Sequence, residues 1–380
     1  MHGCSGFHYR QPCHDTVILF LNRRFLGALR RRHEQLAETV EVPLLRPCSA
    51  MENAALKCLI VQPIHPAGIA ILAQAGIEVV AATQFDMHTI ADEIVDCDAA
   101  ITRNAGLDRA AMQAAAKLRV LGNHGIGTDP VDVVYATEIG LPVVFTPYAN
   151  VQSVAELVIA HMLAVARRVR EADEAVRTDH FGYRYSRDFR EVGGKTIAII
   201  GFGRIGRRTA EIAKAAFGMR VIVHSPRVPE EVIRQAGMEV STDLDATLGQ
   251  SDYVSLHQVL TAETRGSFDR ERLFAMKSGA VLINTARGAL IDADALVEAV
   301  NSRHLRGAAI DVFEKEPLPA DHPFVGTKGI LLSPHIGGST EEALERTAVQ
   351  VATQVVQVLR GERPEHLVNP DVWDQRRTFI

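Results

Sequence analysis

The segment TIAIIGFGRIG, residues 196–206, decides the fold of this chain. Five apolar or β-branched residues predict a buried strand, and the glycines of a GxGxxG pattern follow at once. Gly201 permits a tight turn, Gly203 lets the backbone approach a pyrophosphate, and Gly206 lets the next helix pack closely on the strand. N–H groups at the start of that helix attract negative charge. The segment therefore predicts a dinucleotide site at a strand–helix junction.

The strand expected after this loop, RVIVH at residues 220–224, leads to the position that reads the adenosine ribose. An NAD site usually has Asp or Glu about 20 residues past the glycines, where it accepts from the 2′-hydroxyl. This chain has Ser225 there, with Arg227 two residues later. A hydroxyl and a guanidinium can bind a 2′-phosphate that a carboxylate would repel. The sequence therefore favours NADP, with NAD as the alternative.

Short apolar runs alternate with helical patterns on both sides of the segment. Such alternation predicts parallel sheets with helices on both faces. We therefore expect an α/β fold of two doubly wound parallel-sheet domains, a Rossmann cofactor domain and a flavodoxin-like substrate domain. One long helix is expected over residues 149–169. Strands are expected at 57–61, 77–82, 97–103, 118–124, 141–145, 196–200, 220–224, 252–257, 280–286, 307–313 and 330–335.

The domain boundaries follow from this pattern and from a change in composition near residue 50. The first 50 residues contain arginine but no lysine and do not continue the alternation, so we expect a poorly ordered extension, with Met51 as an alternative start. Residues 51–152 and 333–380 are expected to form the substrate-binding domain, and residues 153–332 the dinucleotide-binding domain. The final helix, near residues 341–359, is expected to return to the first domain.

Composition excludes several classes of protein. The net charge is -5, from 41 basic and 46 acidic side chains with no long block of either sign, which argues against a nucleic-acid surface. No apolar run approaches the roughly 20 residues that cross a bilayer. The five cysteines include no CxxC pair, so neither a disulfide framework nor a metal site is expected. A reducing cytoplasm fits this cysteine usage best.

Three polar residues follow three successive expected strands of the second block. Arg287, Glu316 and His335 come after AVLINTA, GAAIDVF and ILLSP. The carboxyl ends of parallel strands face the ligand crevice, so we expect these side chains to meet there. Histidine can exchange a proton with a hydroxyl or carbonyl oxygen, and a neighbouring carboxylate orients its ring and favours its protonated form. Arginine can bind a substrate carboxylate with two hydrogen bonds. The three residue types suit interconversion of a 2-hydroxy acid and a 2-keto acid.

Each of these residues also has an ordinary structural explanation. His335 alone could cap a loop, Glu316 alone could be a solvated charge, and Arg287 could pair with Asp311 or Asp292. His257, which ends the strand DYVSLH, is the rival for the base. It lacks glycine-rich surroundings, and we therefore place it beside the cofactor or in a structural role.

Several blocks together resemble the D-isomer-specific 2-hydroxyacid dehydrogenases: GFGRIG, MKSGAVLINTARGALIDADAL, AAIDVFEKEPLP and SPHIGGST, in the family's order and covering essentially everything after residue 55. The resemblance implies a substrate domain built from both chain ends and a homodimer. It implies substrate binding by Arg287, acid–base catalysis by His335, and Glu316 as its partner. The loops TRNAG and HGIGTD would hold the substrate carboxylate through N–H groups near Asn104, Ala105, Ile126 and Gly127. The expected cofactor contacts are Gly201, Gly203, Arg204, Ile205, Gly206, Ser225, Arg227, His257, Thr285, Ala286, Asp311, Gly337 and Gly338.

The leading hypothesis is a D-2-hydroxyacid dehydrogenase that acts mainly as a glyoxylate or hydroxypyruvate reductase, with a small acid as its partner. Oxidation of 3-phosphoglycerate is the alternative within the class, because Arg103, Arg109 and His124 could supply the extra positive charge. A dinucleotide-sensing corepressor is the alternative of another class, since one fold can serve several functions. The sequence departs from the family at Val259, where proline is common, and at Ser225, where an acid is usual.

Overall fold

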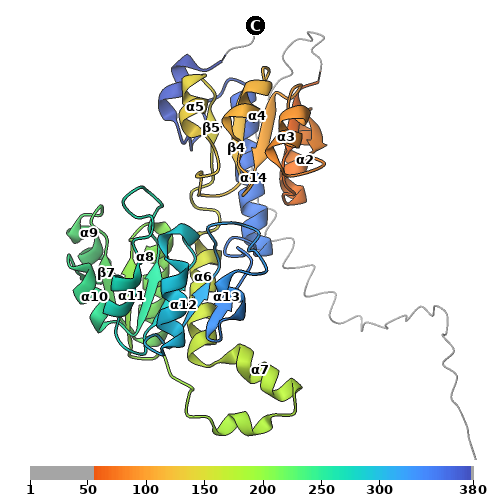
Figure 1. Ribbon diagram of the computed structural model, residues 1–380. Helices are drawn as coiled ribbons and strands as arrows, with labels where there is room; N and C mark the ends of the chain where they lie inside the picture. Colours follow the sequence, from red (N-terminus) through yellow and green to blue (C-terminus); the bar gives the residue numbers. More distant parts are fainter. Residues whose placement is uncertain (1–54, 378–380) are drawn as a thin grey trace, which may run out of the picture. The chain divides into compact units, whose positions relative to one another are not determined.

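The computed structural model describes residues 55–377, which contain two parallel β-sheets flanked by helices (Figure 1). The first sheet has five strands in the order β2-β1-β3-β4-β5, and the second has seven in the order β12-β11-β10-β9-β6-β7-β8. Both orders reverse direction within the sheet, as doubly wound folds do. The predicted fold class is thus confirmed. The strands of the first sheet are β1 (Lys57–Ile60), β2 (Glu78–Ala81), β3 (Ala99–Thr102), β4 (Val120–Asn123) and β5 (Val143–Val144).

The seven-stranded sheet carries the glycine loop at the end of β6, an interior strand that lies between β9 and β7. All of its neighbouring strands pair in parallel, so their carboxyl ends lie along one edge. Its strands are β6 (Thr196–Ile200), β7 (Arg220–His224), β8 (Glu239–Val240), β9 (Tyr253–Leu256), β10 (Val281–Asn284), β11 (Gly307–Ile310) and β12 (Ile330–Leu332). The two-residue β8 was not predicted, because its sequence Glu-Val contains no apolar run like the LPVVF that indicated the equally short β5.

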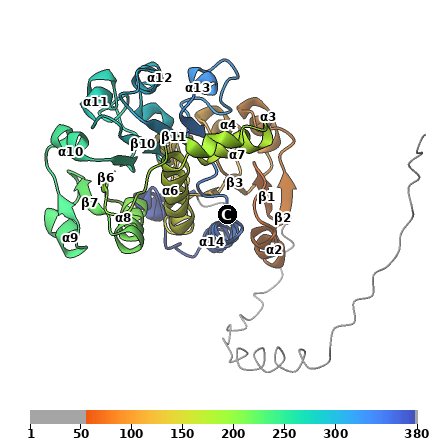
Figure 2. The same ribbon diagram turned by 90° about the horizontal axis from the view of Figure 1, so that it is seen from below.

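Helices α2 (Pro66–Gln74) and α14 (Glu341–Leu359) cover one face of the five-stranded sheet (Figure 2). Val351 and Val355 of α14 are fully buried there, although they lie more than 200 residues after the strands they contact. The other face is covered by α3 (Met87–Glu93), α4 (Arg109–Ala114) and α5 (Val133–Glu138).

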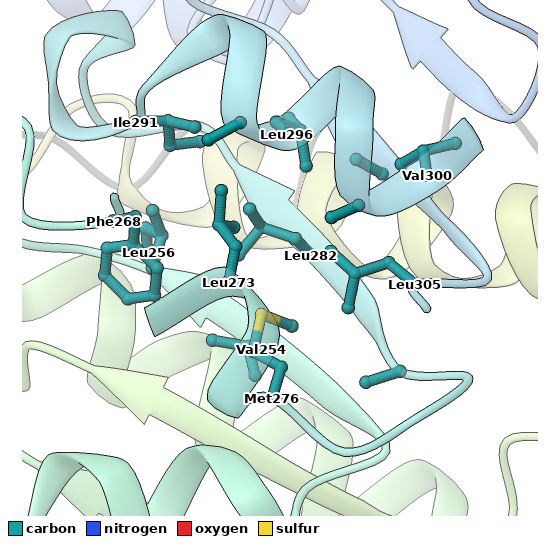
Figure 3. Packing of buried hydrophobic residues seen from close by; sticks show 14 of the residues in the cluster. Val254, Leu256, Phe268, Leu273, Met276, Leu282, Ile291, Leu296, Val300 and Leu305 are labelled. Carbon is teal, nitrogen blue, oxygen red and sulfur yellow. The ribbon is translucent and has the colours of Figure 1, made fainter. Parts of the chain in front are cut away.

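The seven-stranded sheet is also covered on both faces (Figure 2). Figure 3 shows one of these interfaces, where Leu282 of β10 faces Leu296 and Val300 of α12. Full burial of a leucine side chain contributes about 1.5–3 kcal/mol, so each such interface holds a helix firmly on the sheet. The helices on this face are α10 (Leu244–Gln250), α11 (Arg270–Ala275) and α12 (Ala293–Asn301), and those on the other are α6 (Val151–Ala166), α8 (Arg204–Phe217) and α9 (Glu230–Gln235).

The helix predicted over residues 149–169 is α6 (Val151–Ala166), which ends three residues before the predicted end. Helix α6 stops at Ala166, and α7 (Val169–Arg177) starts after Arg168, whose φ of 50° lies in the left-handed region. The Arg168 guanidinium donates to Asp188 Oδ2 (3.0 Å) and to the Arg306 carbonyl (3.1 Å). These distant partners hold the turn, which local periodicity could not reveal.

The remaining elements are short. None of the helices between residues 55 and 377 is long and apolar enough to cross a membrane. The extension predicted for residues 1–50 lies outside the described residues. The short elements are η1 (Phe181–Tyr185), η2 (Gly288–Leu290), α13 (Pro323–Gly326) and η3 (Pro370–Gln375).

Candidate active site

The three glycines of the loop after β6 have distinct surroundings. Gly201 has a φ of +98°, and a Cβ there would lie 2.7 Å from the His257 carbonyl oxygen; a Cβ on Gly206 would lie 2.2 Å from the Gly201 oxygen. A Cβ on Gly203 would meet nothing within 4 Å. Helix α8 then begins without a side-chain cap, so its first N–H groups remain available to an anion. The loop is tight on the protein side and open at Gly203, which fits a dinucleotide pyrophosphate.

Residues next to the loop are connected to it by hydrogen bonds. Ser225 Oγ, just after β7, accepts from the Phe202 N–H at 3.1 Å, and Arg227 is exposed two residues later. Arg204, the first residue of α8, stacks on the Tyr148 ring at 4.2 Å and donates to its hydroxyl at 3.1 Å. The positions predicted to read the ribose and to contact the pyrophosphate therefore flank one loop.

Glu316 and His335 meet beyond the carboxyl ends of the adjacent strands β11 and β12. His335 Nδ1 and Glu316 Oε2 are 2.8 Å apart, and Glu316 Oε1 accepts from the Phe313 N–H at 3.0 Å. Partial burial would raise the pKa of Glu316. The hydrogen bond and charge of His335, the Phe313 N–H and the charge of Arg287 outweigh that effect and place the pKa below its usual value. Glu316 is thus an ionised partner for the imidazole.

The loop that carries His335 is held by the buried carboxylate of Asp311. Asp311 accepts hydrogen bonds from the Ser333 hydroxyl (2.5 Å) and from the N–H groups of Ile336 and Gly337 (both 2.9 Å). His335 itself has a φ of 53°, a left-handed conformation that costs energy for a residue with a side chain. The bonds to Asp311 stabilise that conformation. Sequence reasoning placed Asp311 beside the cofactor and did not identify this contact or Ser333.

The two predicted glycines after His335 lie against the start of α6. A Cβ on Gly337 would lie 3.1 Å from Asp311 Oδ2, and one on Gly338 would lie 3.0 Å from Asn150 Nδ2. Ser153 of α6 donates to the Gly337 carbonyl at 2.6 Å. The loop thus approaches α6 closely, and a side chain at either glycine would have to displace its neighbour.

The turn that carries Arg287 is shaped by Asn284, the fully buried last residue of β10. Its amide donates to the Arg287 carbonyl (2.8 Å) and accepts from the Ala286 N–H (3.0 Å). The buried hydroxyl of Thr285 has no hydrogen-bond partner within residues 55–377, so a polar group of a ligand could satisfy it. Asn284 could have been noticed as a polar residue that interrupts an apolar strand.

The turn at Arg287 also touches the loop that carries Glu316. A Cβ on Gly288 would lie 2.1 Å from the carbonyl carbon of Phe313, so only glycine allows this approach. The side chain of Arg287 pairs with neither Asp311 nor Asp292, the two partners considered from sequence. Asp292 instead caps α12 by accepting from the Ala295 N–H. The acidic partner of Arg287 is Asp129: Nε and Nη2 lie 2.8 and 2.5 Å from Asp129 Oδ2.

His257, the rival base, has a different environment. Its Nε2 lies 2.9 Å from Ser255 Oγ, and burial lowers the pKa of its imidazole to about 3. A histidine with such a pKa stays neutral at physiological pH, so it does not gain and release protons there. The geometry thus favours His335 as the group that transfers protons.

The two predicted substrate loops differ in how many donors they leave free. The Ala105 N–H already donates to Gln62 Oε1 at 2.8 Å, while Asn104 is exposed. The N–H groups of Ile126 and Gly127 make no hydrogen bond to any residue between 55 and 377. A ligand carboxylate would therefore find free donors at Ile126 and Gly127 rather than at Ala105.

The HGIGTD loop is held by hydrogen bonds from Asn123, which was not predicted from the sequence. The amide of the buried Asn123 donates to the carbonyls of Gly125 (3.1 Å) and Gly127 (3.0 Å). Asn123 could have been noticed in the sequence as a polar residue at the end of an apolar strand.

A buried histidine lies next to this loop. His124 is 9% exposed, and its Nε2 has no partner among the described residues. Burial and the charge of Arg103 lower the pKa of His124 to about 4. Arg103 donates to the Pro63 carbonyl at 2.9 Å, whereas Arg109 pairs with Glu138 and Asp132. Arg103 and His124 lie together, and Arg109 is engaged elsewhere.

Comparisons with known proteins agree with this geometry. Residues 159–337 match the family model described as D-isomer specific 2-hydroxyacid dehydrogenase, NAD binding domain. The chain is 40% identical over 269 residues to a glyoxylate reductase of Thermofilum pendens, covering 70% of this chain and 79% of that protein. It is 39% identical over 315 residues to a D-3-phosphoglycerate dehydrogenase of Methanocaldococcus jannaschii, covering 83% of this chain but only 59% of that longer protein.

A solved structure gives a similar result. The NADPH-dependent glyoxylate/hydroxypyruvate reductase of Sinorhizobium meliloti, in complex with NADP and malonate, superposes with a TM-score of 0.76 at 25% identity, over 86% of this chain and 100% of that one. The fold of this chain therefore has a counterpart in a solved reductase structure.

The unequal surroundings of the glycines lead to the first prediction. Gly206→Ala should lower the free energy of unfolding by about 1–3 kcal/mol, because its Cβ meets backbone that cannot move aside. Gly203→Ala should leave stability unchanged yet weaken NAD(P)H binding at least about tenfold, because its Cβ enters the open side of the loop. Urea unfolding and nicotinamide fluorescence titration measure the two effects. Wild-type affinity in Gly203→Ala would contradict the assignment of the open side to the pyrophosphate.

Proposed function

Because the chain belongs to the D-isomer specific 2-hydroxyacid dehydrogenase family, we propose that it transfers a hydride between a nicotinamide dinucleotide and a small 2-keto acid or D-2-hydroxy acid. The observation that carries this proposal is the 2.8 Å pair of His335 and the ionised Glu316 at the carboxyl edge of the sheet that holds the glycine loop. A protein that only senses a dinucleotide carries out no proton transfer, so it would have no use for a histidine paired with a carboxylate.

The side chains have separate roles in the proposed reaction. The bound dinucleotide supplies or accepts the hydride at C2 of the substrate. In reduction, His335 donates the Nε2 proton to the carbonyl oxygen, and Glu316 stabilises the protonated ring and fixes its orientation. Arg287 binds the substrate carboxylate, together with the free N–H groups of Ile126 and Gly127. The reverse reaction returns the proton to His335.

The residues that would hold the dinucleotide surround the edge of the sheet. The buried, unpartnered hydroxyl of Thr285 suits a polar group of the nicotinamide half, and the open Gly203 suits the pyrophosphate. We assign cofactor contacts to Gly201, Gly203, Arg204, Ile205, Gly206, Ser225, Arg227, His257, Thr285, Ala286, Gly337 and Gly338, and a loop-holding role to Asp311.

Glyoxylate or hydroxypyruvate is the substrate we favour, in line with the name of the Thermofilum pendens relative. His335→Asn should lower kcat for their reduction by about 10²–10⁴-fold, because asparagine cannot transfer the proton, while NAD(P)H still binds. Nicotinamide oxidation at 340 nm measures the loss, and His88→Asn, at a side chain 89% exposed, is the matched control. Absence of turnover by the wild-type protein with every 2-keto acid tried would reject the proposed activity.

A second candidate, 3-phosphoglycerate oxidation, is favoured by one observation. Arg103 is partly buried beside His124, whose buried Nε2 has no partner within the described residues, so a second anionic group of a substrate would find donors there. The name of the Methanocaldococcus jannaschii relative points the same way. Faster turnover of 3-phosphohydroxypyruvate than of hydroxypyruvate in the same assay would favour this candidate.

We propose NADP as the preferred dinucleotide. Ser225 stands where an acidic residue would read a free ribose hydroxyl, and the exposed Arg227 has its guanidinium available to a 2′-phosphate. The Sinorhizobium meliloti structure contains NADP.

Cofactor choice can be tested at Arg227. Arg227→Ala should raise KM for NADPH about tenfold or more and leave KM for NADH nearly unchanged, because only NADPH carries the phosphate. Steady-state kinetics with both cofactors measure the difference, and Arg234→Ala on α9 is the matched control. An equal effect on both cofactors would defeat the assignment.

The division of labour between the sheets follows from these roles. We propose that residues 51–152 and 333–380 form the substrate-binding domain, since the HGIGTD loop and α14 belong to the five-stranded sheet. Residues 153–332 would then form the dinucleotide-binding domain. Cys58 and Cys97 are free and buried, which suits the cytoplasm, where we place the protein.

We also propose a homodimer that uses α7 and η1. Figure 1 shows this segment extending away from the seven-stranded sheet, and α7 has no buried residue. Val176, Phe181 and Tyr185 are 61%, 63% and 79% exposed there, an apolar surface that suits contact with a second copy.

The dimer can be tested by charging this surface. Phe181→Asp combined with Tyr185→Asp should halve the mass measured by sedimentation velocity, because carboxylates oppose burial of the surface. Val232→Asp, at a partly exposed side chain of α9, should leave the mass unchanged. A monomeric wild-type protein would contradict the proposal.

A further inference from the structure

Arg287 is held on two sides before any substrate is bound. Its Nη1 donates to the Ala286 carbonyl at 2.7 Å, and its Nε and Nη2 donate to Asp129 Oδ2 at 2.8 and 2.5 Å. A guanidinium has five N–H groups, so one on Nη1 and one on Nη2 remain for another acceptor. The Arg287 side chain is therefore held in place while two of its N–H groups remain free to bind a ligand.

Asp129 lies on the loop that offers the free backbone donors. Gly127, two residues earlier, is so close to Arg287 that a Cβ on it would lie 1.8 Å from Nη2 and 3.3 Å from Asp129 Oδ2. The guanidinium thus lies directly against the loop whose Ile126 and Gly127 N–H groups are free. The buried Asn123 fixes this loop, so Asp129 is a carboxylate on a rigid support.

Stability does not explain the pair. The side chains of Arg287 and Asp129 are 33% and 38% exposed, and ion pairs with this much solvent access contribute little to folding. Asp129 makes no other side-chain hydrogen bond to residues 55–377. Asp129 therefore affects mainly the orientation of the Arg287 guanidinium.

We propose that Asp129 is a positioning residue, which orients Arg287 so that its two remaining N–H groups and those of Ile126 and Gly127 converge on the substrate carboxylate. The inference rests on the proposed function, in which Arg287 binds that carboxylate. An arginine without this partner would sample several rotamers and hold the 2-keto acid less often in the reactive orientation.

Two substitutions test the role. Asp129→Ala should lower kcat for the 2-keto acid about tenfold or more, because the guanidinium loses its orientation. Asp129→Asn should retain at least about a third of wild-type kcat, because its amide oxygen still accepts from Nε and Nη2. The dissociation constant of NAD(P)H and the unfolding midpoint should match the wild type in both variants.

Asp132→Asn is the matched control, because it removes a charge from the same loop. Asp132 caps α5 by accepting from the Tyr135 N–H, and asparagine caps equally well. This variant should show wild-type kcat and KM.

A binding measurement separates this inference from the activity itself. Calorimetry with oxamate, an unreactive analogue of a 2-keto acid, on the protein saturated with NAD(P)H should show about tenfold weaker binding for Asp129→Ala and near wild-type binding for Asp129→Asn. This pattern in a protein that turns over no 2-keto acid would reject the proposed function and support the role of Asp129.

Other outcomes would overturn the role of Asp129. A lower KM with unchanged kcat in both Asp129 variants would show that the carboxylate competes with the substrate for Arg287. Wild-type kinetics and oxamate binding in Asp129→Ala would show that the pair is incidental. Failure of the wild-type protein both to bind oxamate and to turn over a 2-keto acid would overturn the inference together with the function.

Discussion

The buried carboxylate of Asp311 is the constraint on which the rest of the site depends. Asp311 is 1% exposed and has a hydroxyl and two N–H groups as donors, all from the loop after β12. A buried charge is costly unless it is hydrogen-bonded, so this loop cannot move away without leaving the carboxylate unsatisfied. The His335 N–H also donates to the Asp311 carbonyl, at 2.8 Å. The position of the imidazole therefore follows from the requirement that the buried Asp311 carboxylate be hydrogen-bonded by this loop.

Most of the fold could be predicted from the sequence, because parallel strands buried on both faces appear as continuous apolar runs. The positions of Arg287, Glu316 and His335 could be predicted for the same reason, since strand ends in a parallel sheet share one edge. What could not be predicted depends on partners far along the chain. The turn at Arg168, between α6 and α7, has its hydrogen-bond partners at Asp188 and Arg306.

The partner of Arg287 shows the same limit within the site. Asp129 lies 158 positions from Arg287 and on the other sheet's loops, so no spacing in the sequence indicates the pair. The buried amides of Asn123 and Asn284 were also missed, although both end apolar strands. Polar residues at the last position of a buried strand shape the loop that follows, and they could be sought in other chains of this fold.

The two histidines near the cofactor loop show how burial separates their chemistry. The His257 carbonyl lies close to Gly201, and burial lowers the pKa of the His257 imidazole to about 3, which keeps the ring neutral. His335 is 34% exposed and lies beside an ionised carboxylate, so it can exchange protons with a ligand. From residue type and strand position alone, either histidine could have been the base. The difference between them lies in their partners, because His257 Nε2 faces the Ser255 hydroxyl whereas His335 Nδ1 faces the Glu316 carboxylate.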